Sequence, residues 1–83
     1  MKQIEMILSP CYGKVETVDI IQDAYVYEWE TSFTIKKQDG SIEHVTFGIS
    51  GKVVSIEVEQ GDEVIPGMVL AYLEEDLAIT GSD

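Results

Sequence analysis

The chain has no arginine, one cysteine, one histidine and two prolines among its 83 residues. Five lysines stand against sixteen Asp and Glu residues, so the formal net charge at pH 7 is −11. Phosphate recognition needs a cationic surface and favours the bidentate guanidinium group. The composition therefore argues against a nucleic-acid partner, and the same charge argues against an anionic membrane surface.

The scarcity of cysteine and histidine limits the chemistry of the chain. Cys11 has no second cysteine with which to form an internal disulfide, and His44 has no Cys/His cluster around it, so we expect no metal site. Few residues remain for a nucleophile or a general base, and we expect no enzyme activity from this chain alone. Cys11 is interpreted as a small buried hydrophobic residue, and His44 as structural or exposed rather than as a phosphoryl acceptor.

No long apolar run is present, and the first ten residues, MKQIEMILSP, carry charge within the first five. This pattern predicts neither a signal peptide nor a membrane span, and a cytoplasmic protein is expected. An apolar fraction of 45% favours one folded domain, which we place at residues 1–76. The segment 77–83 loses the apolar pattern and is expected to fray.

Short segments alternate apolar and polar residues, as in Val54–Glu59 and Met68–Leu73, whereas helical periodicity is poor. The sequence therefore predicts an all-β fold. Turn signals separate the segments, and Pro66-Gly67 suits a type II turn. Asp39-Gly40, between the expected strands Thr34–Lys37 and Ser41–Thr46, is expected to form a two-residue type I′ hairpin.

The chain also contains a weak internal repeat. Gly13–Gln22 recurs as Gly51–Gln60, since both segments begin Gly-Lys-Val, place apolar residues at the sixth and eighth positions, and end in Gln. Neither half offers enough surface for a core of its own, so we expect the halves to intertwine around the Asp39-Gly40 hairpin.

Three segments resemble the biotinyl and lipoyl carrier domains typified by biotin carboxyl carrier protein. Ser9–Val15 resembles the opening A-P-M-P-G-x-V of that family, Ile49–Val54 resembles its D-G-x-V segment, and Gln60–Leu70 matches x-G-D-x-V-x-x-G-x-x-L. The resemblance runs from about Met6 to Glu75. It implies a barrel-sandwich hybrid, a flattened barrel of about eight short strands in two pseudo-symmetric halves.

In the carrier family, a lysine at the tip of the central hairpin accepts biotin or lipoate. Counting back from Gly51 places Asp39 and Gly40 at that tip, where neither side chain offers an amine. The resemblance therefore implies a non-catalytic carrier-like domain without cofactor, which acts through protein contacts, as a scaffold or regulator of a carboxylase or acyltransferase assembly. The alternative is a working biotin carboxyl carrier subunit of an acyl-CoA carboxylase, modified at Lys37.

Tyr25, Tyr27 and Trp29 are close together in the first half, and Trp29 stands where the family has a turn glycine. Alternation along one strand would let these rings cap an open end of the barrel. The same rings could instead form an interface with another protein. Both interpretations stay open at this point.

Acidic residues cluster in the second half of the chain, at Glu57, Glu59, Asp62, Glu63, Glu74, Glu75 and Asp76. A solvated face that opposes edge-to-edge pairing is the simplest explanation. The charge could also steer docking onto a basic partner. We expect a monomer or a weak homodimer through an unpaired strand edge.

Overall fold

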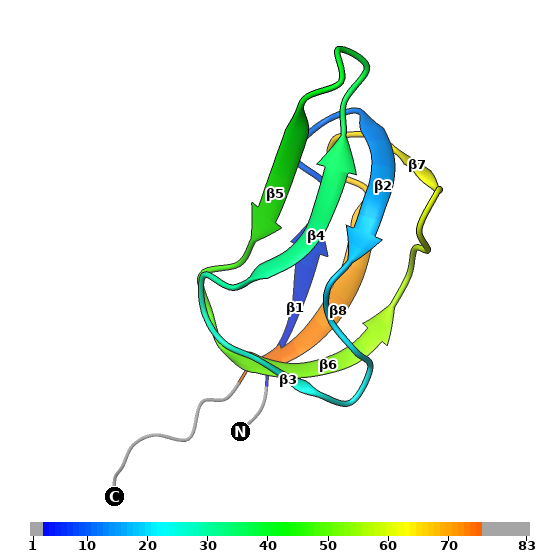
Figure 1. The fold of residues 1–83 in the computed structure, drawn as a ribbon. Helices are drawn as coiled ribbons and strands as arrows, with labels where there is room; N and C mark the ends of the chain where they lie inside the picture. Colours follow the sequence, from blue (N-terminus) through cyan, green and yellow to red (C-terminus); the bar gives the residue numbers. More distant parts are fainter. Residues whose placement is uncertain (1–2, 76–83) are drawn as a thin grey trace, which may run out of the picture.

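The computed structural model describes residues 3–75 and contains eight strands. They are β1 (Gln3–Leu8), β2 (Gly13–Val18), β3 (Tyr25–Val26), β4 (Thr31–Lys36), β5 (Ile42–Thr46), β6 (Gly51–Ile56), β7 (Glu63–Val64) and β8 (Val69–Glu75), drawn in Figure 1. The predicted all-β class is confirmed. Nothing in this part of the chain is a helix long and apolar enough to cross a membrane. The segment 77–83, expected to fray, lies outside the described residues.

The strands form two four-stranded antiparallel sheets, ordered β1-β8-β6-β3 and β5-β4-β2-β7. Each sheet takes two strands from the first half of the chain and two from the second. The halves therefore intertwine, as expected from the sequence, because neither half holds a complete sheet. The hairpin that joins β4 to β5 lies at the end of the molecule opposite to the start of β1 and the end of β8 (Figure 1).

The internal repeat has an offset of 38 residues, since β2 begins at Gly13 and β6 at Gly51. The two sheets match in detail at this offset. In β2 the register against β4 shifts between Val15 and Thr17, and in β6 the register against β8 shifts between Val53 and Ser55. The predicted repeat is confirmed, and it extends to the β-bulges, which bend and twist both sheets alike.

The core lies between the two sheets and draws on both. Its fully buried side chains include Ile7, Val15, Phe33, Ile35, Val53, Val64, Leu70 and Leu73. On β1, β2 and β6 they are flanked by exposed residues, as the period of two requires, whereas β4 and β8 each bury two successive residues near a register shift. Each fully buried apolar side chain of this size stabilises the fold by roughly 1.5–3 kcal/mol, so the core holds the domain together without a disulfide.

The predicted turn at Pro66-Gly67 can be compared with the structure. In the Pro66-Gly67 turn, the N–H of Met68 donates to the carbonyl of Ile65 at 3.1 Å, and Gly67 has a φ of 86°. The type II prediction is therefore confirmed, because that turn requires a positive φ at its third residue.

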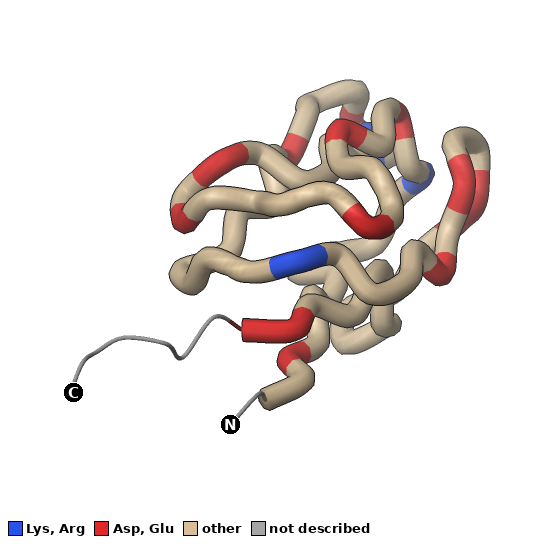
Figure 2. Tube along the Cα trace, turned by 90° about the horizontal axis from the view of Figure 1, so that it is seen from below, with Lys and Arg blue, Asp and Glu red and all other residues tan. Residues whose placement is uncertain are grey.

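Acidic segments occupy many of the loops, as Figure 2 shows from the end at which the chain termini leave the molecule.

Candidate functional site: the hairpin between β4 and β5

The hairpin closes differently from the two-residue turn expected at Asp39-Gly40. The N–H of Lys37 donates to the carbonyl of Ser41 at 2.8 Å, and the N–H of Gly40 donates to the carbonyl of Lys37 at 2.9 Å. Gly40 has a φ of 89°, whereas Asp39 is not among the residues with positive φ. A type I′ turn needs positive φ at both central residues, so that prediction is wrong. The loop is instead a three-residue one, Gln38-Asp39-Gly40, in which Gly40 takes the left-handed position.

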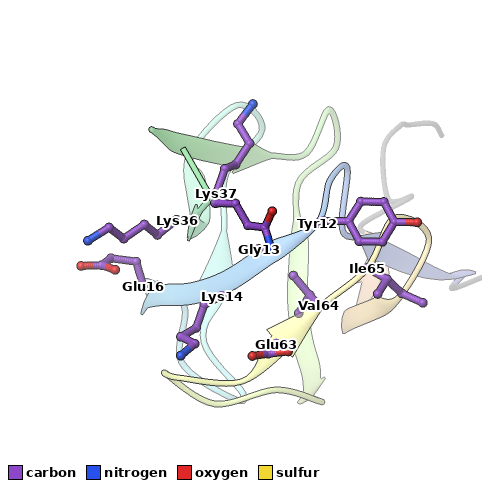
Figure 3. A pocket seen from close by; sticks show the side chains of 10 residues that line it. Tyr12, Gly13, Lys14, Glu16, Lys36, Lys37, Glu63, Val64 and Ile65 are labelled. Carbon is purple, nitrogen blue, oxygen red and sulfur yellow. The ribbon is translucent and has the colours of Figure 1, made fainter. Parts of the chain in front are cut away.

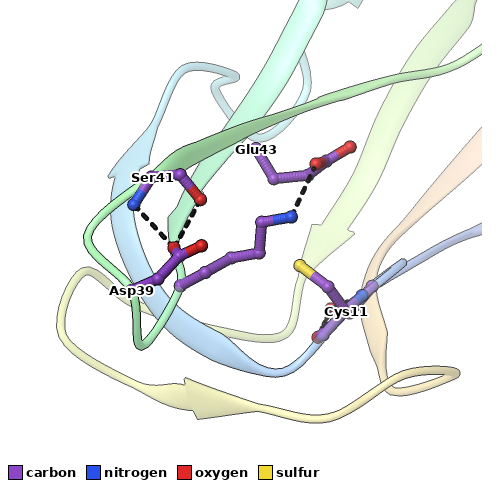
Figure 4. A network of polar contacts seen from close by, with 6 residues as sticks. Cys11, Asp39, Ser41 and Glu43 are labelled. Carbon is purple, nitrogen blue, oxygen red and sulfur yellow. Dashed lines mark hydrogen bonds and ion pairs between the residues drawn. The ribbon is translucent and has the colours of Figure 1, made fainter.

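The apex of the hairpin is held by a local carboxylate. Asp39 Oδ1 accepts hydrogen bonds from Ser41 Oγ at 2.6 Å and from the Ser41 N–H at 2.9 Å (Figure 4). These bonds lower the pKa of the Asp39 carboxyl below its ordinary value because they stabilise the charged form, and the bond from the Ser41 hydroxyl has the larger effect. Asp39 therefore serves the turn as an acceptor, and its side chain offers no amine.

Lys37 is the first residue of the turn, beside the apex rather than on it. Its Nζ lies 3.6 Å from Glu43 Oε1, and the two side chains are 38% and 40% exposed. The dashed line that ends on Glu43 in Figure 4 marks this ion pair. A pair this exposed contributes little to stability, but it gives the ammonium group a preferred position next to the strand.

Cys11 approaches the same pair. Its side chain is half-buried against the core, which agrees in part with the predicted core residue. Burial raises the pKa of the thiol, the Glu43 carboxylate raises it further, and the Lys37 ammonium opposes them. Because the thiolate is the nucleophilic form, this environment disfavours reaction at Cys11.

A depression of about 550 Å³ opens beside the hairpin. Its lining includes Lys14, Lys36 and Lys37, with the carboxylates Glu16 and Glu63 among them. Figure 3 shows the three lysine side chains pointing in different directions. They do not converge on one point, so the depression lacks the arrangement that would hold a single anion.

The three aromatic residues singled out in the first half are on the surface. The side chains of Tyr25, Tyr27 and Trp29 are 44%, 62% and 68% exposed, so the interpretation that they cap the core is wrong. The expected long strand is absent, since β3 covers only Tyr25–Val26. Tyr25 and Tyr27 instead contact each other edge to face, with ring centroids 4.9 Å apart. Their role as an interface stays a prediction.

His44 is exposed on β5, opposite Thr34, which agrees with the structural or exposed role expected for it. Within residues 3–75, no three His, Cys, Asp or Glu side chains are grouped closely enough to hold a metal ion. The contact between Lys37 and Glu43 was missed from the sequence. Opposite charges on the two arms of an expected hairpin were its only signal.

The chain was also compared with known proteins. No protein-family model matches it, and no curated protein matches it.

Proposed function

We propose that the chain is a carrier-like domain that does not itself carry biotin or lipoate and that acts through protein contacts. Its place would be that of a scaffold or regulator of a carboxylase or acyltransferase assembly. In this proposal the two matching halves form the flattened barrel of the carrier fold, and the hairpin between β4 and β5 corresponds to the hairpin that bears the lysine in carriers.

The observation that carries the proposal is the composition of the hairpin loop. Its three residues, Gln38, Asp39 and Gly40, include no amine. Acylation by a ligase requires an amine nucleophile presented to an activated acid. A hairpin loop without an amine supports a role in recognition rather than in group transfer.

Lys37 supports the alternative function, in which the chain is a carboxyl carrier subunit. It begins the turn and its side chain is 38% exposed, so a ligase could reach it. Its Nζ, however, lies beside Glu43 and not at the apex. A modification there would require the ammonium to leave the carboxylate and lose its proton before attack.

The experiment is co-expression with a biotin ligase and, separately, with a lipoate ligase, followed by intact-mass measurement. We expect the wild-type chain to keep its unmodified mass. An adduct that disappears in Lys37→Arg would refute the proposal and establish the carrier alternative.

Two variants test whether the carrier shape is retained. Asp39→Lys places an amine in the loop at a residue with an ordinary φ, and Gly40→Lys places one at the position counted from the sequence, where φ is 89°. Acylation of either variant, with the wild type unmodified, supports a carrier fold that lost its chemistry at the hairpin. If neither variant is acylated, the relation to carriers loses its support.

A further inference from the structure

The outer face of the sheet β1-β8-β6-β3 carries a group of exposed apolar side chains beside the charged residues Lys52 and Glu74. On β1, Ile4, Met6 and Leu8 are 53%, 49% and 44% exposed, and they alternate with the inward-facing Ile7. The face continues across the sheet through the half-buried Tyr72 of β8 to Val54 of β6 and Tyr25 of β3, which are 39% and 44% exposed. The register places Met6 opposite Tyr72, whereas Ile4 and Tyr25 lie at the two ends of a row that crosses Glu74 and Lys52. We name this surface the β1-β8-β6 face.

The other sheet provides an internal comparison, because every position of this face has a counterpart at the 38-residue offset. Met6 corresponds to His44, Leu8 to Thr46, and Tyr72 to Thr34. Val54 corresponds to Glu16, and Tyr25 to Glu63. Only Ile42, the counterpart of Ile4, is a large exposed hydrophobic residue on the outer face of the sheet β5-β4-β2-β7, at 42%.

The comparison shows whether the fold requires apolar side chains on the outer face of a sheet. Both sheets have the same strand order at the offset, the same bulges and equally buried inner faces. The sheet with His44, Thr46 and Thr34 satisfies that architecture with a polar exterior. The apolar side chains of the β1-β8-β6 face are therefore not required by the fold, and contiguous exposed apolar residues mark an interaction surface.

Charge indicates which partner the surface fits. The four strands of this sheet contain one lysine, Lys52, and three glutamates, Glu5, Glu74 and Glu75, of which Glu74 lies on the face opposite Ile4 and Lys52. At the end of β6, Glu57 accepts a hydrogen bond from Ser55 Oγ at 2.7 Å, and Ser55 is opposite Tyr72. A second copy docked face to face would bring these carboxylates together in a chain of net charge −11. Lysine or arginine around an apolar strip would complement them.

We propose that the β1-β8-β6 face docks a partner protein through an apolar strip bordered by basic side chains. This rests on the proposed function, because it specifies the protein contact through which the domain would act. Met6 and Tyr72, adjacent across β1 and β8, are the central anchors, and the carboxylates of the rim set the orientation and increase the rate of association.

The test uses two synthetic peptides of equal length, in which leucine alternates with lysine or with glutamate. Each is titrated into the full chain labelled for amide NMR. We expect the Leu-Lys peptide to shift amides of β1, β8 and β6 and the Leu-Glu peptide to bind at least about tenfold more weakly, a difference of about 1.4 kcal/mol.

The repeat supplies matched variants. Met6→His with Tyr72→Thr installs the polar counterparts, and we expect it to weaken binding of the Leu-Lys peptide by about tenfold or more. The reciprocal variant, His44→Met with Thr34→Tyr, should make the other sheet respond to the peptide. Thermal unfolding of each variant verifies that the fold is kept. If Met6→His with Tyr72→Thr does not fold, the response of the reciprocal variant to the Leu-Lys peptide still tests the proposal.

Three results would overturn the proposal: shifts confined to β5, β4 and β2, equal binding of both peptides, or wild-type affinity in Met6→His with Tyr72→Thr. Sedimentation over a range of concentrations can give a fourth result that overturns it. Dimerisation that this double variant abolishes would make a second copy the occupant. An acyl adduct in the mass measurement contradicts the proposed function but does not alter the peptide result, so the two failures are distinguishable.

Discussion

Trp29 and Gly67 occupy equivalent positions at the 38-residue offset and share one backbone conformation, with φ of 68° and 86°. The N–H of Trp29 donates to the carbonyl of Phe47 at 2.8 Å, as the N–H of Gly67 donates to that of Ser9 at 2.9 Å. A left-handed conformation costs a residue with a Cβ about 1–2 kcal/mol. The pairing of the neighbouring segments therefore holds Trp29 in a conformation suited to glycine.

Replacing Trp29 by glycine should remove this strain. We expect Trp29→Gly to unfold with a free energy equal to or up to about 1 kcal/mol above that of wild type, since the exposed ring loses little contact. Gly67→Ala, with nothing within 4 Å of the added Cβ, should lower stability by about 1–2 kcal/mol through the backbone alone. Urea unfolding followed by circular dichroism measures both. A strong loss of stability in Trp29→Gly would show that the ring, and not the turn, is what the position requires.

The glycines that open the two repeats are required for a different reason. A Cβ on Gly51 would overlap the carbonyl of Glu74, and a Cβ on Gly13 would lie 2.6 Å from the carbonyl oxygen of Lys36. These obstacles are backbone atoms of the adjacent strands and cannot rotate away. We expect Gly13→Ala and Gly51→Ala each to destabilise the fold by about 1–3 kcal/mol or more, as overpacking does.

Gly48→Ala is the matched control for these substitutions. Its Cβ would meet only the indole of Trp29, at 2.9 Å, and that exposed ring can move. Thermal unfolding should leave Gly48→Ala within about 0.5 kcal/mol of wild type, as for most surface substitutions. Equal losses in all three variants would mean that close strand approach is not the reason for the glycines.

The sequence predicted the strands and the repeat because alternation and turn glycines are local signals. It failed where a conformation depends on pairing. Trp29 and Asp23 adopt positive φ, although neither residue type signals it as glycine does. The Asp39-Gly40 pair predicts a two-residue turn, whereas the hydrogen bond between Lys37 and Ser41 closes a loop of three residues. The apolar outer face was not recognised either, because exposure of Met6 and Tyr72 follows only from knowing which side of the sheet the core occupies.

Two buried serines should respond to alanine in opposite directions. Ser32 is fully buried and its hydroxyl has no hydrogen-bond partner, whereas Ser9 is buried with its hydroxyl donating to the carbonyl of Cys11 at 2.8 Å. A buried unpaired hydroxyl costs about 1–3 kcal/mol, and a satisfied one contributes about 1 kcal/mol. Ser32→Ala should therefore raise the free energy of unfolding and Ser9→Ala should lower it, as measured by urea unfolding. A loss of stability in Ser32→Ala would indicate that the hydroxyl has a partner in solution.

The hairpin should weaken in acid because of Asp39. Its pKa is lowered in the folded chain by the Ser41 hydroxyl and N–H, so the carboxylate stabilises the loop fully above its ordinary pKa of about 3.9. That contribution is lost as pH falls below this value and through the folded pKa. An NMR titration from neutral to acid should show the amide of Ser41 moving with the Asp39 carboxyl, at a pKa below the ordinary one. Ser41→Ala should raise that pKa, and Asp39→Asn, which keeps an acceptor oxygen but has no titrating carboxyl, should abolish the shift. An Asp39 pKa at or above its ordinary value would show that the loop does not hold the carboxylate.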